Sequence, residues 1–274
     1  MIKNKIFGRF AFQFMAVCLA AALLAGCSAV PENTIFSAED LPGSTIGVEK
    51  ATTGADYAKG FEKTPEEGKP AAEVVEYDRI EDAVAALVSG ELDCVICDDN
   101  PAKHYVSRNE GLQILPDIFS EEYYAFAVNK EKPELLTEID TAMIELKNDG
   151  IIEKILDGYL GDNTSGYKYE SPNGIQRSRG TVTVATNADY APYIYKHPAG
   201  GYVGIDVDIL NALCDKLGYE PSIKNMEFEK VIDSVVSGEC DIGIGAVSVT
   251  KDRIQAVNFS ESYAKGIQVI ITRI

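Results

Sequence analysis

The sequence predicts an α/β protein built from two related lobes. Strand-like apolar runs alternate with helical patterns, which is typical of parallel sheets covered by helices. The stretch VSGELDCVICDD from residue 88 returns as VSGECDIGIGAVS from residue 236, so one helix-to-strand joint occurs twice. A length of 274 residues also suits two small domains.

The N-terminus has the features of a secretory signal. Lys3, Lys5 and Arg9 precede the short apolar run AFQFMAVCLAAALLAGC. Its end, LLAGC, resembles the lipobox of bacterial lipoproteins, in which a diacylglycerol is attached to the cysteine, here Cys27. We therefore expect residues 1–26 to be a signal peptide and residues 27–40 to be a lipidated tether. The alternative is an ordinary signal peptide.

The charge of the chain restricts its partners. The formal net charge is −18, and the predicted signal peptide contributes only positive charges. Such a surface repels nucleic acid and anionic lipid headgroups. No segment after the signal is long and apolar enough to span a bilayer. We therefore expect an extracytoplasmic protein, attached to the cell membrane through acyl chains on Cys27.

The first half of the chain predicts its elements in the following order. A strand over residues 45–49 precedes a helix over 55–61, and a second helix over 80–89 precedes a buried strand over 94–97. A further strand over 123–128 then leads into two helical patterns, which the sequence Asn-Asp-Gly at 148–150 separates.

The second half repeats this plan after a linker. Residues 161–180 are rich in Gly, Ser, Asn and Pro and lack an apolar period, so they predict a connection without regular structure. A strand over 181–186, a helix over 204–217, a helix over 228–235 and a strand over 242–247 follow.

The residues that could support redox or metal chemistry have simpler explanations. Cys94 and Cys97 have C-x-x-C spacing, but side chains three apart on a strand point to opposite faces, so we expect free cysteines. The sequence contains neither G-x-S-x-G nor H-E-x-x-H, and GIGAV at 243–247 lacks the third glycine of a dinucleotide loop. We expect no catalytic residue, no metal and no cofactor.

Residues 180–273 resemble the first lobe of the bacterial extracellular solute-binding proteins of family 3, the polar amino-acid receptors of ABC transporters. The resemblance rests on GTVTVATNADYAPY, GYVGIDVDILNALCDKLGY and MEFEKVIDSVVSGECDIGIGAVSVTKDRIQAVNFSESY. Residues 40–160 resemble the remainder of the same family through DLPGSTIGVEKATTGADYA, AALVSGELDCVICDD and YYAFAVNKEKPELLTEIDTAMIELKNDGIIEKILDGYLG. The resemblance implies a periplasmic binding protein type 2 (Venus flytrap) fold.

The two halves stand in reversed order relative to that family, which predicts a circular permutation. The expected parts are a smaller lobe over 41–123, a hinge strand and packing helices over 124–160, a permutation linker over 161–180, and a larger lobe with a terminal hinge strand over 181–274. Chain termini of compact domains often lie close together, so such rearrangements are tolerated. Two alternatives to the permutation stay open. One is a truncated remnant of two fused binding proteins, in which lobes pair between chains as a swapped dimer, and the other is a sequencing or gene-model break.

The resemblance implies a site for the two charges of an amino acid. It places Arg253 on the α-carboxylate, with Ser248 beside it, and Asp98 on the α-ammonium. A guanidinium can grip a carboxylate with two parallel hydrogen bonds. Thr53 adds a hydroxyl or a backbone N–H at a helix N-terminus.

Further side chains are expected around the ligand. The resemblance places Tyr190 and Phe228 on the ligand's side chain, and Thr52, Ala246 and Tyr193 complete the set. Asn187 stands where many members that bind basic amino acids or glutamine have aspartate, so the sequence favours a polar ligand that is uncharged or modestly charged.

We therefore expect a lipid-anchored protein that captures a polar amino acid between two lobes and delivers it to an ABC transporter permease. A ligand sensor that serves a receptor is one alternative. An enzyme that resembles cyclohexadienyl dehydratase, on the same fold, is another.

Overall fold

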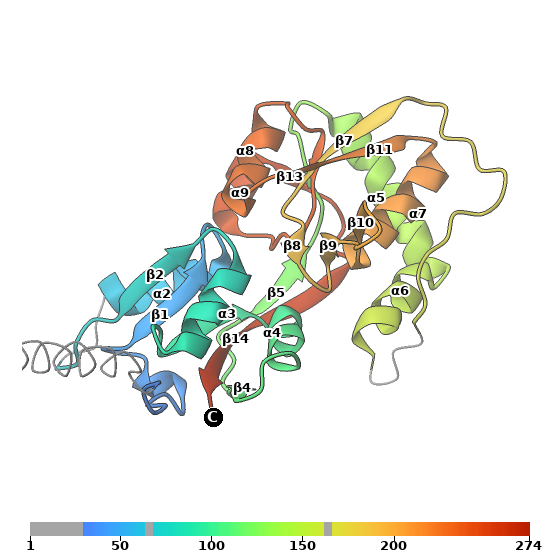
Figure 1. Ribbon diagram of the computed structural model, residues 1–274. Coiled ribbons are helices and arrows are strands. Elements are labelled where there is room, and N and C mark those ends of the chain that lie inside the picture. The colour runs from blue at the N-terminus through green and yellow to red at the C-terminus, as the bar shows by residue number, and fades with distance from the viewer. Residues whose placement is uncertain (1–29, 64–67, 162–165) are drawn as a thin grey trace, which may run out of the picture. The chain divides into compact units, whose positions relative to one another are not determined.

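The computed structural model describes residues 30–63, 68–161 and 166–274 (Figure 1). The predicted signal peptide and Cys27 lie outside these residues. In the described part of the chain, no helix has the length and apolar character that a membrane span requires. All contacts discussed below lie within one unit, Asn33–Ile274.

The smaller lobe is built on a sheet with the strand order β2-β1-β3-β14-β4, in which β5 pairs with β14. β1, β2 and β3 run parallel, and β14 runs antiparallel to β3. We call residues 33–124 and 264–274 together the smaller lobe. Its elements are η1 (Ala38–Asp40), β1 (Thr45–Glu49), α2 (Thr53–Lys63), β2 (Glu73–Tyr77), α3 (Ile80–Ser89), β3 (Cys94–Asp98), α4 (Asp99–Val106), β4 (Leu112–Ile114), β5 (Glu121–Tyr124) and β14 (Ala264–Arg273).

The larger lobe, residues 125–263, is built on a sheet with the order β11-β7-β12-β6-β13, beside a small sheet β10-β9-β8. Helices α5 and α6 both pack against α7. Its elements are β6 (Ala127–Val128), α5 (Pro133–Asn148), α6 (Ile151–Leu160), β7 (Thr181–Thr186), β8 (Asp189–Tyr190), β9 (Ile194–Lys196), β10 (Tyr202–Val203), α7 (Ile205–Leu217), β11 (Glu220–Asn225), η2 (Phe228–Lys230), α8 (Val231–Val236), β12 (Ile242–Gly243), α9 (Lys251–Ala256) and β13 (Asn258–Phe259).

Two neighbouring segments connect the lobes. β5 pairs with β14, and the two strands run side by side between the main sheets (Figure 1). From β5 the chain enters the larger lobe as β6, and from β13 it returns to the smaller lobe as β14. Each main sheet therefore contains a strand from the other half of the chain. The predicted strand over residues 123–128 is wrong as one element, because it leaves one sheet and joins the other.

The first copy of the repeated joint forms as predicted. The apolar positions of α3 are buried on one face, and Gly90 ends the helix with a φ of 85°. Its backbone N–H donates to the carbonyls of Ala86 and Leu87. Because this left-handed conformation costs glycine little, the chain can turn sharply there into β3.

The second copy departs from the prediction after β12. The expected strand over 242–247 ends at Gly243, because Gly245 (φ 123°) and Ala246 (φ 51°) leave the extended region. The backbone N–H groups of these two residues donate to Asp206 instead of to a neighbouring strand. The chain therefore forms a wall of the pocket described below.

The predicted α/β class and its two lobes are confirmed, and so is the prediction for the C-x-x-C pair. Cys94 belongs to a core cluster on one face of the sheet, and Cys97 belongs to the cluster on the other face. The four cysteines of the described residues, Cys94, Cys97, Cys214 and Cys240, are free and buried.

Candidate functional site

A pocket lies where the carboxyl ends of strands from both lobes meet. The ends of β1 and β3 contribute from the smaller lobe, and the segments after β7 and β12 contribute from the larger lobe. Open α/β sheets commonly bind ligands at such strand ends. The empty space is about 310 Å³, including the part open to solvent. The lining residues are Glu49, Thr52, Thr53, Asp98, Asn187, Tyr190, Phe228, Gly245, Ala246, Ser248 and Arg253.

The structure brings nine of the ten predicted ligand-binding residues to this pocket, and their ligand contacts remain predictions. Tyr193 is the exception, which corrects its expected place on the pocket wall. Its ring is fully buried and lies edge-on against Tyr124, with the ring centroids 5.3 Å apart. Its hydroxyl accepts a hydrogen bond from Asn100 of the smaller lobe (3.1 Å), so it supports the lobe contact from behind.

Arg253 extends from α9 across to the smaller lobe. Its Nη1 donates to the Ser248 carbonyl (2.9 Å), and its Nη2 donates to the Ala51 carbonyl (2.8 Å). The guanidinium also lies over the Phe228 ring, 5.5 Å from its centroid. Burial lowers the pKa of Arg253, and the charge of Glu122 opposes this shift. The group stays cationic, since an arginine pKa starts far above neutral pH.

Glu122 engages the two hydroxyls that were expected to hold a carboxylate. Thr53 Oγ1 donates to Glu122 Oε2 (2.8 Å), and the Ser248 hydroxyl donates to the same oxygen. Gln268 Nε2 donates to Thr53 Oγ1 (3.1 Å). A hydroxyl has one proton, so in this arrangement both oxygens can only accept from a ligand. Arg253 therefore becomes the main side-chain donor available to a carboxylate.

Asp98 ends β3 and is 6% exposed. The hydroxyls of Tyr124 and Tyr190 both donate to it, and so does Gln268 Nε2 (2.8 Å). Burial raises the pKa of Asp98 to about 7, although the two tyrosine hydrogen bonds act in the opposite direction. A ligand ammonium would have to displace or share one of these donors.

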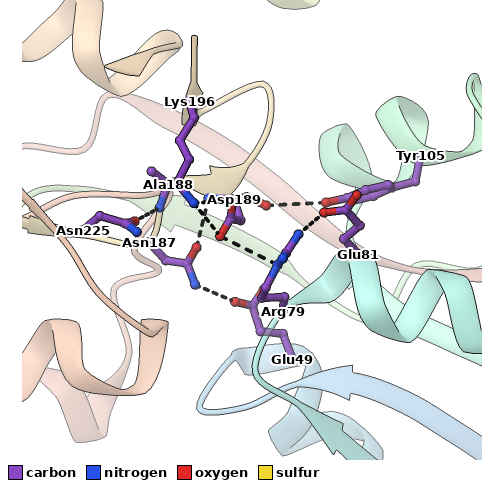
Figure 2. Close-up of polar contacts among 9 residues, drawn as sticks. All are labelled: Glu49, Arg79, Glu81, Tyr105, Asn187, Ala188, Asp189, Lys196 and Asn225. Carbon is purple, nitrogen blue, oxygen red and sulfur yellow. Dashed lines mark hydrogen bonds and ion pairs between the residues drawn. The ribbon is translucent and has the colours of Figure 1, made fainter. Parts of the chain in front are cut away.

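Glu49 is a pocket residue that the sequence prediction missed. It ends β1, is 4% exposed, and accepts a hydrogen bond from Asn187 Nδ2 at 3.2 Å, as Figure 2 shows. Burial raises the pKa of Glu49 to about 8, and the like charges of Asp98 and Asp189 add to this shift. The available signal was a glutamate at the end of an otherwise apolar strand, TIGVE.

The lobes also meet beside Glu49, around Asp189 (Figure 2). Arg79 Nε of the smaller lobe lies 3.7 Å from Asp189 Oδ2, and the Tyr105 hydroxyl donates to the Asp189 carbonyl (3.4 Å). Lys196 Nζ lies 3.1 Å from Asp189 Oδ1 within the larger lobe. Charged groups from both lobes therefore border the pocket near Asn187.

Asp206 fixes the wall formed by Gly245 and Ala246. Its Oδ2 accepts the backbone N–H groups of these residues at 2.6 and 3.0 Å, and its Oδ1 accepts the Tyr263 hydroxyl at 2.7 Å. Burial raises the pKa of Asp206 to about 6, and the three hydrogen bonds limit the shift.

Within residues 30–63, 68–161 and 166–274 no cluster of three or more metal-binding side chains occurs.

Comparison with known proteins finds partial relatives. Residues 182–274 match the model of the bacterial extracellular solute-binding proteins, family 3. The chain is 30% identical over 103 residues to an arginine-binding extracellular protein of Bacillus subtilis, which is 38% of this chain and 40% of that protein. It is 29% identical over 93 residues to a cyclohexadienyl dehydratase of Pseudomonas aeruginosa, which is 34% of this chain and 35% of that enzyme.

A solved structure of an ancestral arginine-binding protein bound to arginine is 36% identical, with a TM-score of 0.30. The alignment covers 30% of this chain and 37% of that one. Each of these matches thus spans 40% or less of the protein compared. The likeness to the bacterial extracellular solute-binding proteins, family 3, thus rests on residues 182–274.

Proposed function

We propose that this chain captures a free amino acid in the pocket between its lobes and presents it to an ABC transporter permease. One observation carries the proposal: Arg253 of the larger lobe and Asp98 of the smaller lobe line the same pocket. A zwitterion needs an opposite charge or several hydrogen bonds at each end when it leaves water. The relatives of the chain include proteins named for binding amino acids.

The placement of the two charges suggests how binding becomes a signal. A ligand that contacts Arg253 and Asp98 together stabilises the state in which the lobes meet. The ligand shifts the equilibrium toward this state by its difference in affinity for the two states. A permease then distinguishes the loaded protein by its closed lobes.

A thermal-shift screen over the twenty amino acids tests the proposal. At a ligand concentration of about 100 Kd, one amino acid should stabilise the protein by about 2.7 kcal/mol. Arg253→Ala should remove this stabilisation. Lys251→Ala, an exposed change on the same helix, should keep it. The proposal fails if no amino acid raises the melting temperature, or if Arg253→Ala responds like the unaltered protein.

We also infer that the lobes are circularly permuted within one monomer. The family match lies at residues 182–274, and β6 and β14 each cross to the opposite sheet, which supports this order. The mass of the ligand-binding species decides the question, because a swapped dimer would have twice the mass of a monomer. Lipid attachment at Cys27 is a separate proposal, and Cys27→Ser should release the protein from membranes.

A dehydratase is the second candidate function. The similarity to a cyclohexadienyl dehydratase and the two buried carboxyl groups of Glu49 and Asp98 favour it, since a carboxyl that keeps its proton near neutral pH can act as a general acid. Loss of water and carbon dioxide from prephenate in the presence of the protein would support it. A ligand sensor would use the same pocket residues as the proposed transport protein and would differ from it only in its partner.

A further inference from the structure

We infer that Glu49 determines the specificity of this pocket, and that the ligand is an amino acid with a second positive charge on its side chain. The inference rests on the proposed function, because it assumes that an amino acid fills the pocket. It assigns a role to a buried carboxylate that neither the α-carboxylate nor the α-ammonium of a ligand uses.

The charges that line the pocket do not balance for a simple zwitterion. Arg253 provides one positive charge, and Asp98 and Glu49 line the pocket with two ionisable carboxyls. Glu122 lies behind the lining, where it accepts the hydroxyls of Thr53 and Ser248. An α-carboxylate pairs with Arg253 and an α-ammonium pairs with Asp98, which leaves Glu49 without a counterion from the ligand. An ionised carboxylate in a buried site is costly unless it is paired, so a cation at the far end of the ligand would stabilise the ionised form of Glu49.

Glu49 retains capacity to accept hydrogen bonds. The donors that the described residues direct at it are the Asn187 amide (3.2 Å) and the backbone N–H of Ile80. An ionised carboxylate offers about four lone-pair sites, so about two sites stay available for a ligand ammonium or guanidinium.

The nearest protein cation has other partners. Arg79 Nη2 pairs with Glu81, and Arg79 Nε faces Asp189 at 3.7 Å (Figure 2). Its charge lowers the pKa of Glu49, against the larger effect of burial. Arg79 therefore offsets part of the negative charge around Glu49 without forming a direct ion pair with it.

The amide of Asn187 orients the Glu49 carboxylate. The expectation from the sequence, that a neutral residue at 187 disfavours a cationic side chain, considered that position alone. In the structure Asn187 donates to a carboxylate that reaches the same corner from the other lobe. The aromatic rings of Tyr190 and Phe228 also line the pocket, and aromatic faces attract cations. The ligand class that fits is an amino acid with a terminal ammonium or guanidinium.

Isothermal titration at pH 8 with two matched pairs tests the inference. L-arginine is compared with L-citrulline, and L-lysine with L-norleucine, since each pair differs chiefly in the terminal charge. We expect the cationic member to bind about 10-fold more tightly or better in at least one pair. Glu49→Gln should reduce this ratio to about 3-fold or less, and Glu49→Asp should preserve a preference for the cation because the charge remains. Glu153→Gln, an exposed change on α6, is the matched control and should keep the full ratio.

Each outcome has a defined meaning. Equal affinity within both pairs overturns the inference and leaves amino-acid binding intact. A preference that persists in Glu49→Gln overturns the role of Glu49. If Glu49→Gln does not fold, the unaltered protein and Glu49→Asp still test the inference. Both should prefer the cationic ligand, and an unaltered protein without this preference is sufficient to reject the inference. If none of the twenty amino acids binds, the proposed function and this inference both fall.

Discussion

The Tyr190 hydroxyl donates a hydrogen bond to the Asp98 carboxylate, and this bond joins the larger lobe to the smaller lobe inside the pocket. Asp98 is thus bonded to a side chain of the opposite lobe. A ligand ammonium competes with Tyr190 for the same carboxylate, so the tyrosine influences the stability of the unliganded protein as well as binding.

Tyr190→Phe should destabilise the unliganded protein by about 1.5–3 kcal/mol, because it removes a hydrogen bond to a buried charged group. Denaturation in urea measures the change. Tyr202→Phe, a half-buried tyrosine on β10, is the control and should change stability by less than about 0.5 kcal/mol. Equal effects of the two variants would show that the Tyr190–Asp98 bond does not hold the lobes.

Raising the pH from about 5 to 8 should lower the stability of the unliganded protein. The pKa of Glu49 is raised from 4.5 to about 8 on folding, so the folded state binds more protons than the unfolded state throughout this interval. The stabilisation is complete below the unfolded pKa and is lost as the pH rises through the folded pKa. Asp98, with a pKa of about 7, acts in the same direction.

Glu49→Gln isolates the contribution of this residue to the pH dependence. The variant should flatten the decline between pH 5 and 8 by about 1 kcal/mol or more, since one pKa unit corresponds to about 1.4 kcal/mol. Thermal unfolding at several pH values, with Glu153→Gln as the exposed control, provides the measurement. A decline that is as steep in Glu49→Gln as in the control contradicts the prediction.

Gly266→Ala should destabilise the junction of the lobes by about 1–3 kcal/mol, as overpacking does in other cores. A Cβ at Gly266 would lie 1.7 Å from the Tyr124 hydroxyl oxygen. Gly60→Ala on α2 is the control, because among residues 30–63, 68–161 and 166–274 a Cβ there meets no atom beyond its own helix within 4 Å, and alanine favours helix. In urea denaturation, Gly266→Ala should therefore lower the free energy of unfolding and Gly60→Ala should raise it. A Gly266→Ala protein as stable as the unaltered protein would contradict the packing described.

Asp206→Asn should loosen the wall formed by Gly245 and Ala246. The amide has one carbonyl oxygen in place of the two carboxylate oxygens that accept three hydrogen bonds here. Amide hydrogen exchange at Gly245 and Ala246 should become faster by about 10-fold or more, which corresponds to the loss of about 1.4 kcal/mol of protection. Asp233→Asn, exposed on α8, should leave both amides unchanged.

The order of the elements was predictable because local patterns decide it. The apolar face of α3 and the Gly90 that ends it belong to one short stretch of sequence, so the helix-to-strand joint appears without tertiary information. The early end of β12 at Gly243, within the strand predicted over residues 242–247, could not be predicted in this way. There Asp206 accepts the backbone N–H groups that a longer strand would use. The break between β5 and β6 likewise depends on which sheet each end joins.

The residues that line the pocket were predictable where the resemblance supplied positions, such as Asp98 at the end of β3 and Arg253 on α9. Glu49 was missed because its importance comes from Asn187, which lies 138 residues further along the chain. Tyr193 was expected among the ligand-binding residues, whereas its ring packs edge-on against Tyr124. Glu122 shows the same limit, because only the folded chain brings the hydroxyls of Thr53 and Ser248 to it.

The exchange of β6 and β14 between the sheets has a consequence for synthesis on the ribosome. β3 pairs with β14, and the Gln268–Asp98 contact joins positions 170 residues apart. Until β14 has been made, the sheet of the smaller lobe lacks the strand between β3 and β4. Such distant pairings slow folding, and an open strand edge can pair with other chains. A nascent chain that is held unfolded until β14 emerges should therefore reach the native state with less aggregation.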